Sequence, residues 1–95
     1  MQRLLDKVAI ITGGTGGIGL ATAKLFLAEG AQVALVDLDQ GSLDAAVTDI
    51  GSERSIGIAA DVSDADQVAA FVEATMQKFG RVDVFFANAG IEGAV

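Results

Sequence analysis

The chain has 95 residues, 52% of them hydrophobic and 20% charged, which predicts a folded globular domain and argues against disorder. A net charge of −7 disfavours nucleic-acid binding, and the absence of cysteine and histidine excludes disulfides and the usual zinc ligands, so we expect no metal site. The sequence shows neither an apolar run of about 20 residues nor a secretory signal, so we expect a cytoplasmic protein without membrane contact.

The first half of the chain predicts strand, helix, strand and helix in turn. Residues 7–12 are a short apolar run ended by glycine, which is typical of a buried strand. Residues 18–29 predict a helix, residues 32–37 repeat the strand pattern, and residues 42–50 predict a shorter helix. The buried face of the first helix is expected to consist of apolar residues at helical spacing: Ile18, Ala21, Leu25 and Ala28, with Leu20, Phe26 and Leu27 beside them.

The second half continues the alternation. Residues 55–60 predict a third strand, which is weakened by an internal glycine. Ser63 is expected to cap a long helix that ends at Gly80, and residues 82–87 predict a fourth strand. Strands that alternate with helices in this way favour an α/β fold, with a parallel sheet covered by helices on both faces.

The order of elements corresponds to half of a doubly wound Rossmann fold, with about four parallel strands and three helices, where the whole fold has six strands. We expect the strands to lie in the order 3-2-1-4. Residues 1–95 are accordingly expected to form a single truncated dinucleotide-binding domain.

Glycines crowd the turn between the first strand and the first helix, in the stretch TGGTGGIG from Thr12 to Gly19. A bare loop at a helix start lets phosphate groups approach the backbone N–H groups, although a tight turn alone would also use glycine. The context favours a pyrophosphate site, because an acid, Asp37, ends the next strand. From that position a carboxylate can accept both hydroxyls of an adenosine ribose.

Three further features extend the pattern along the chain. The loop satisfies the spacing T-G-x-x-x-G-x-G through Thr12, Gly13, Gly17 and Gly19. After the third strand come Asp61 and Val62, and after the fourth come Asn88, Ala89 and Gly90. In this order the motifs resemble those of the short-chain dehydrogenase/reductase family in its classical type, and they cover nearly the whole chain.

The resemblance implies a nicotinamide-dependent oxidoreductase family and a role for each matching position. Gly13, Gly17 and Gly19 would form the phosphate loop that Thr12 introduces, with Ile18 in its wall. Asp37 would hold the adenosine ribose. The adenine pocket would be lined by Asp61 and Val62, and the segment beneath the ribose and nicotinamide would be Asn88, Ala89 and Gly90.

The charges near Asp37 indicate which cofactor is preferred. A 2′-phosphate would lie against this carboxylate, and the sequence has no arginine or lysine between Lys24 and Arg54 to offset the repulsion. We therefore expect NAD(H) as the cofactor, with NADP less favoured.

The family's chemistry needs a serine and a Y-x-x-x-K pair from its second half, and this chain contains no tyrosine. We expect it to bind cofactor without catalysing hydride transfer alone, so no residue is assigned a catalytic role. The fourth strand would form an apolar sheet edge, with Phe85 and Phe86 on opposite faces, which predicts self-association through that edge.

Three alternatives stay open at this point. The chain could be a complete oxidoreductase when a second half is supplied by another chain. It could be a non-catalytic interaction module whose glycine loop is vestigial. It could also be a methyltransferase-like binder of S-adenosylmethionine, because such proteins share the Gly-rich loop and the acid on the second strand.

Overall fold

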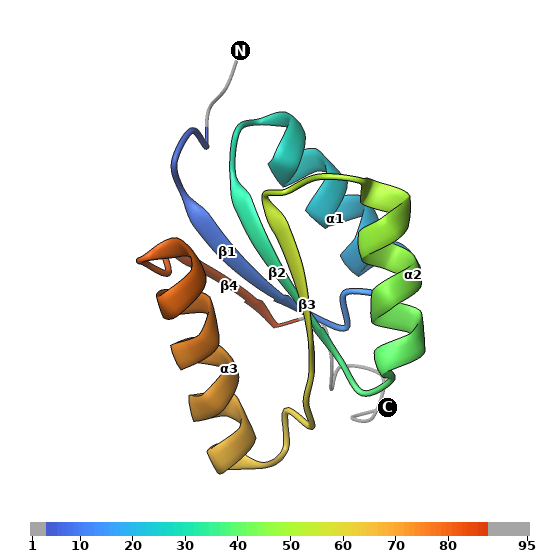
Figure 1. The fold of residues 1–95 in the computed structure, drawn as a ribbon, viewed down its shortest axis with the longest axis vertical. Helices are drawn as coiled ribbons and strands as arrows, with labels where there is room; N and C mark the ends of the chain where they lie inside the picture. The colour runs from blue at the N-terminus through green and yellow to red at the C-terminus, as the bar shows by residue number, and fades with distance from the viewer. Residues whose placement is uncertain (1–3, 88–95) are drawn as a thin grey trace.

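The computed structural model describes residues 4–87. Seven elements alternate along them: β1 (Val8–Thr12), α1 (Gly17–Ala28), β2 (Gln32–Asp37), α2 (Gln40–Ile50), β3 (Ser55–Ala59), α3 (Ala65–Phe79) and β4 (Val84–Ala87). In Figure 1, α1 and α2 lie on one face of the sheet and α3 lies on the other. None of the helices in the described part of the chain is long and apolar enough to cross a membrane.

The four strands are parallel and lie in the order β3-β2-β1-β4. Strand β1 lies between β2 and β4, and all five of its residues are buried. This position explains why its sequence is continuously apolar and does not alternate with polar residues. The predicted α/β fold, with three helices and the strand order 3-2-1-4 of a Rossmann-like half, is confirmed.

Two hydrophobic cores lie on the two faces of the sheet, because successive strand residues point to opposite sides. Ile11 packs toward α1 and α2, whereas Ile10 packs toward Phe71 of α3. The same alternation continues in β4. Phe86 packs on the core beneath α1 and α2, and the ring centroid of Phe85 lies 6.0 Å from that of Phe71.

Helix α1 buries a different face from the predicted one. Its fully buried residues are Gly19, Ala23 and Leu27, whereas Ile18 and Leu25 are 68% and 61% exposed. The prediction was wrong for Ile18, Ala21, Leu25 and Ala28, but Leu27 is buried as predicted, and Leu20 and Phe26 pack on the same core. Spacing alone does not select the buried side, because α1 is apolar around most of its circumference. Ala23 has a small side chain and lies in the core beneath α1, and Gly19 packs against the turn at Gly13 and Gly14.

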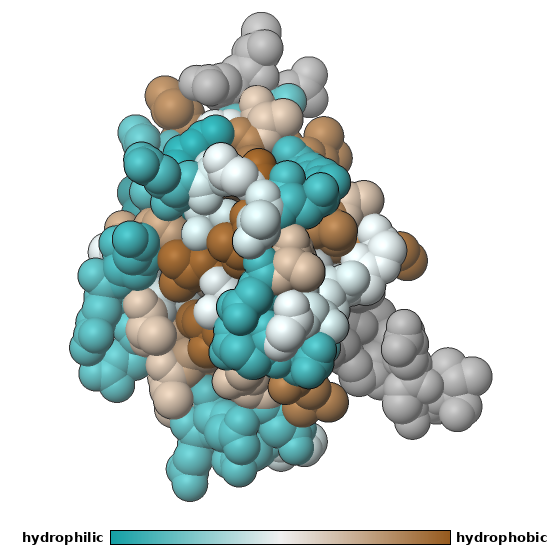
Figure 2. Space-filling model, turned by 45° about the vertical axis from the view of Figure 1, so that its right-hand side comes forward, coloured by the Kyte–Doolittle hydropathy of each residue, from teal (hydrophilic) through white to brown (hydrophobic). Residues whose placement is uncertain are grey.

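The exposed apolar side of α1 consists of Ile18, Ala21, Leu25 and Ala28. Figure 2 brings the side with α1 and α2 forward and shows hydrophobic residues reaching the surface between hydrophilic ones. A helix with apolar residues on both of its sides is normally packed against other structural elements on both sides.

The glycine within β3 allows close packing of α2. A Cβ atom at Gly57 would lie 3.2 Å from Cβ of Leu43 and 3.3 Å from Cγ2 of Val47. Even a methyl group there would require these side chains to shift by a few tenths of an ångström, so the glycine that weakens the strand pattern is explained by helix packing.

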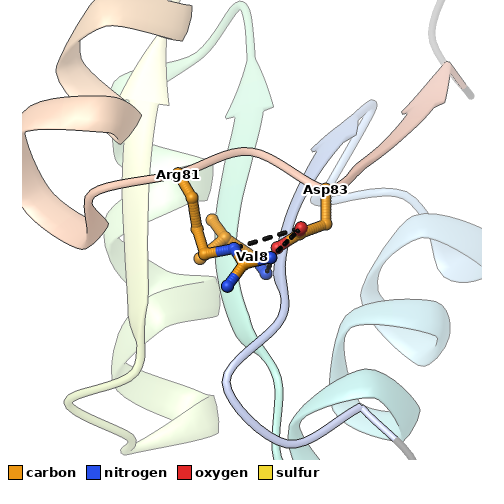
Figure 3. A network of polar contacts seen from close by, with 3 residues as sticks. All are labelled: Val8, Arg81 and Asp83. Atoms are coloured by element: carbon orange, nitrogen blue, oxygen red, sulfur yellow. Dashed lines mark hydrogen bonds and ion pairs between the residues drawn. The ribbon is translucent and has the colours of Figure 1, made fainter.

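The amino-terminal end of the sheet is closed by a small polar cluster (Figure 3). The carboxylate of Asp83 accepts a hydrogen bond from the backbone N–H of Val8 at 2.9 Å, and its other oxygen lies 2.7 Å from Nη2 of Arg81. These contacts occupy the residues just before β4, which begins at Val84 and not at the predicted residue 82.

Candidate functional site

The loops that follow the strands meet at one edge of the sheet, toward the bottom of Figure 1. Thr12, the last residue of β1, pairs with Val36 of β2 and Ala87 of β4, and Asp37 pairs with Ala59 of β3. The strands therefore end nearly level with one another. In open parallel sheets, ligands bind outside this carboxyl-terminal edge.

The turn after β1 is tight, and several of its glycines are needed for the fold itself. Gly13 has φ 67°, in the left-handed region that favours glycine, and its carbonyl accepts the N–H of Gly16 at 3.1 Å. A Cβ at Gly19 would overlap the carbonyl oxygen of Gly13 and lie 3.0 Å from its carbonyl carbon. The start of α1 can therefore pack against the turn only because Gly19 has no side chain.

Gly17 has a different environment. Apart from its chain neighbours and the backbone of its own helix, no atom of residues 4–87 would lie within 4 Å of a Cβ there, and the residue is exposed. Packing and backbone contacts in the described residues therefore give no reason for glycine at this position. The open space fits a ligand that approaches the loop backbone closely.

Helix α1 also begins differently from the other two helices of the described chain. Its N-cap, Gly16, provides no side-chain hydrogen bond, whereas Asp39 and Asp64 accept backbone N–H groups at the starts of α2 and α3. The first N–H groups of a helix have no intrahelical partner, and they carry the positive end of the helix dipole. The start of α1 is therefore suited to an anion such as a pyrophosphate.

Asp37 ends β2 and is hydrogen-bonded to the glycine loop. Its Oδ2 accepts the backbone N–H of Thr15 at 3.2 Å and also the Thr15 hydroxyl, and its Oδ1 accepts the N–H of Leu38 at 2.8 Å. Burial by itself would raise the pKa of Asp37, but the hydrogen bonds from Thr15 and Leu38 outweigh it and lower the pKa. The carboxylate is therefore ionised at neutral pH, beside the loop.

Asp61 and Val62 lie on the neighbouring loop, after β3. This loop adjoins Asp37, whose carbonyl accepts the N–H of Ala60 at 2.9 Å. Oδ1 of Asp61 accepts the N–H and the hydroxyl of Ser63, at 2.9 and 2.7 Å, and the hydroxyl is the main cause of a lowered Asp61 pKa. Val62 packs on the core beneath α3.

This role of Ser63 corrects the predicted helix cap. The N-cap of α3 is Asp64, whose Oδ1 accepts the N–H groups of Asp66 and Gln67 at 2.9 and 3.4 Å. The hydroxyl of Ser63 is already bonded to Asp61, so the next residue provides the cap. Ser63 thus fixes the orientation of a predicted adenine-site residue.

The remaining predicted residues differ in their burial and in their position relative to the loop. Thr12 is buried, and its hydroxyl donates to the carbonyl oxygen of Phe86 at 3.4 Å, which links the ends of β1 and β4. Ile18 is exposed beside the loop. The predicted positions Asn88, Ala89 and Gly90 lie outside the described residues.

The sequence prediction missed two residues that lie in this site. Thr15 provides two of the hydrogen bonds to Asp37, and Leu38, beside Asp37, is a large apolar residue that is 71% exposed. The sequence did contain a signal for the role of Thr15. It is a hydroxyl residue within a glycine loop, and an acid ends the strand that follows. Clusters of side chains suited to a metal ion are absent from residues 4–87.

The parallel sheet, the open glycine loop and the ionised acid on the second strand together define a Rossmann-like fold with the features of a dinucleotide site. The sequence profile of the short chain dehydrogenase family matches residues 7–95. The chain belongs to this family, and the predicted resemblance is confirmed.

Relatives with assigned activities are similar over almost the whole chain. Levodione reductase of Leifsonia aquatica is 48% identical over an alignment of length 95, which covers 96% of this chain and 36% of that protein. Momilactone A synthase of Oryza sativa subsp. japonica is 40% identical over 92 residues, or 97% of this chain and 34% of that protein. The chain thus spans about a third of the length of these relatives.

Solved structures agree with this assignment. The crystal structure of levodione reductase matches with a TM-score of 0.87 at 46% identity, over 95% of this chain and 36% of that one. A 3-ketoacyl-(acyl-carrier-protein) reductase from Brucella melitensis, complexed with NADH, matches with a TM-score of 0.82 at 40% identity, over 86% of this chain and 33% of that one.

Proposed function

We propose that this chain is the NAD(H)-binding part of a short-chain dehydrogenase/reductase. The observation that carries the proposal is the contact between Thr15 and Asp37, which joins an anion-binding loop to an ionised acid able to accept ribose hydroxyls. The similarity to a reductase that was solved with NADH supports the same ligand class. When bound, the nicotinamide of such a cofactor donates or accepts a hydride.

Each part of the site would hold a different part of the dinucleotide. The loop of Gly13, Gly17 and Gly19 binds the pyrophosphate at the start of α1, with Ile18 against it. Asp37 binds the adenosine ribose, and Asp61 and Val62 line the adenine pocket. The roles of Asn88, Ala89 and Gly90 beneath the nicotinamide stay predictions from the resemblance.

We infer that NAD is preferred over NADP, because a 2′-phosphate would meet the carboxylates of Asp37 and Asp39. The two cations nearest in sequence are engaged elsewhere. Nζ of Lys24 lies 2.8 Å from Oδ2 of Asp49, and the guanidinium of Arg54 donates to the carbonyls of Leu27 and Ala31 at 3.0 and 3.3 Å. Neither is therefore held in place to neutralise a phosphate next to Asp37.

The oxidoreductase activity is proposed for the whole protein of which these residues are the cofactor-binding part. The chain contains no tyrosine, so the family's acid–base tyrosine must come from outside these 95 residues. We further propose that the isolated chain binds cofactor without turnover, that it self-associates through the β4 edge, and that it is cytoplasmic.

Calorimetric titration of the folded chain tests the proposal. We expect NADH to bind, NADPH to bind about tenfold more weakly or worse, and S-adenosylmethionine not to bind. Failure of NADH to bind at millimolar concentration would reject the proposal and favour an interaction module. Tight binding of S-adenosylmethionine would favour the methyltransferase-like alternative, and alcohol or ketone turnover would reject the predicted inactivity.

A further inference from the structure

The carboxylate of Asp37 has little free capacity for further hydrogen bonds. Oδ2 accepts both the N–H and the hydroxyl of Thr15, and Oδ1 accepts the N–H of Leu38. An ionised carboxylate offers about four acceptor positions, two on each oxygen. Within residues 4–87, three positions are therefore taken and one remains, on Oδ1, whereas a ribose with two free hydroxyls requires two.

Only one of the three present donors can leave without a change in the backbone. The N–H of Thr15 is fixed within the turn that the Gly13–Gly16 hydrogen bond closes, and the N–H of Leu38 belongs to the residue next to Asp37. The Thr15 hydroxyl, in contrast, moves away by rotation about the Cα–Cβ bond.

The surroundings of Thr15 leave room for that rotation. Its side chain borders an open groove of about 360 Å³ between α1 and α2, and the groove is also lined by Leu20, Ser42 and Asp49. A hydroxyl that turns away from Asp37 can therefore find polar side chains or water there.

We propose that the Thr15 hydroxyl is a displaceable substitute for a ribose hydroxyl, and that it gives up its position on Asp37 when the vicinal diol of an adenosine ribose binds. This inference rests on the proposed function. Thr15 is then a positioning residue that acts through Asp37 and lowers the affinity for the diol. A ribose with a 2′-phosphate has only its 3′-hydroxyl to donate, which the remaining position on Oδ1 can accept, so Thr15 does not compete with it.

Two substitutions separate the hydroxyl from the rest of the side chain. Thr15→Val keeps the shape and removes the hydroxyl, and Thr15→Ser keeps the hydroxyl and removes the methyl group. Because a net hydrogen bond to Asp37 no longer has to be broken, we expect Thr15→Val to bind NADH about three- to tenfold more tightly than the original chain. Thr15→Ser should bind NADH like the original chain, and NADPH affinity should stay nearly unchanged in both variants.

The closing experiment is calorimetric titration of the three chains with NADH and with NADPH, each shown to be folded by circular dichroism. Thr15→Ala serves as a second hydroxyl-free variant with the same expected gain, in case Thr15→Val does not fold. If the original chain binds NADH and the hydroxyl-free variants bind it equally or more weakly, this inference is wrong while the proposed function stands. An equal gain for NADPH also overturns it. If no chain binds NADH, the proposed function fails and this inference fails with it.

A ligand-independent measurement accompanies the titration. NMR titration of the Asp37 carboxyl should give a higher pKa in Thr15→Val than in Thr15→Ser, because only the second variant keeps the hydroxyl bond that stabilises the ionised form. Equal pKa values in the two variants would show that the hydroxyl does not occupy the carboxylate in solution, and would overturn the inference.

Discussion

Val8 and Asp83 are 75 residues apart, yet they exchange two hydrogen bonds. The N–H of Asp83 donates to the carbonyl of Val8 at 2.8 Å, and the carboxylate of Asp83 accepts the N–H of Val8 at 2.9 Å. Strand β4 is thereby aligned with β1 from its first residue (Figure 3). One carboxylate sets the register of the strand pair at the point where the chain returns from α3.

The Asp83 contact predicts acid sensitivity of the fold. Hydrogen bonds from Arg81 and from the N–H of Val8 hold the pKa of Asp83 below its ordinary value. Asp83 therefore stabilises the folded state at pH values above the ordinary aspartate pKa of about 4, and this contribution is lost as the pH falls through the lowered folded-state pKa. We expect Asp83→Asn to lower the free energy of unfolding at pH 7, with a smaller difference at pH 3, as measured by urea denaturation.

Glu53→Gln provides the control for this experiment. Glu53 is exposed, and no hydrogen bond or ion pair joins it to another residue in the described range 4–87. The Glu53→Gln substitution should change the unfolding free energy by less than about 0.5 kcal/mol at either pH. A difference between Asp83→Asn and the original chain that does not shrink with falling pH would contradict the proposed role of the carboxylate.

The same substitution should reduce NADH binding at both Gly17 and Gly19 but lower stability only at Gly19. Gly19→Ala places a methyl group on the carbonyl of Gly13, so we expect a loss of about 1–3 kcal/mol in unfolding free energy together with a loss of NADH binding. The methyl group of Gly17→Ala would contact no neighbouring side chain or loop within residues 4–87, so stability should change by less than about 0.5 kcal/mol while NADH affinity falls. Thermal unfolding and calorimetry measure the two effects, and unchanged NADH affinity in Gly17→Ala would place the pyrophosphate elsewhere.

Asp37 should determine both affinity and cofactor preference. Asp37→Ala removes a charged hydrogen-bond acceptor from the ribose, so NADH binding should weaken by roughly 1.5–3 kcal/mol, and the preference over NADPH should largely disappear. Asp39→Ser is the matched control for NADH affinity, because it removes a neighbouring carboxylate that caps α2 but keeps a capping side chain. Parallel titrations that show equal effects for the two variants would contradict the ribose assignment.

The β4 edge should govern self-association. Ala87→Lys places a charge on the edge strand, whereas Ala70→Lys adds the same charge to an exposed position of α3. Light scattering should show a larger average mass for the original chain and for Ala70→Lys than for Ala87→Lys. A monomer at high concentration for the original chain would remove the basis for this prediction.

The sequence was sufficient to predict the element order and the parallel sheet, because apolar runs and helix stops leave few topologies for a chain of this length. It could not predict the buried face of α1. Gly19 and Ala23 are buried because small residues permit close packing, against the turn and in the core respectively, and hydropathy assigns their positions no preference over Leu25. The face of a helix that is apolar on both sides depends on tertiary packing.

The site was predictable where a motif fixes a backbone conformation, as at Gly13, and less so where side chains bond to each other. The Thr15–Asp37 and Ser63–Asp61 contacts join loops to acids through hydroxyl groups. Motif spacing does not specify which hydroxyl meets which carboxylate. Such contacts depend on how far each strand extends before its loop begins.

The two ends of β1 have different roles, although the strand is only five residues long. At one end, Val8 holds the register of β4 through Asp83, and at the other end the chain turns into the glycine loop. At a loop position such as Gly17, where the described residues leave open space, a substitution can alter what the protein recognises without disturbing the alignment of the strands, whereas Gly19 serves both the loop and the fold. At such positions, ligand preference and thermal stability can therefore be changed separately, by evolution or by protein engineering.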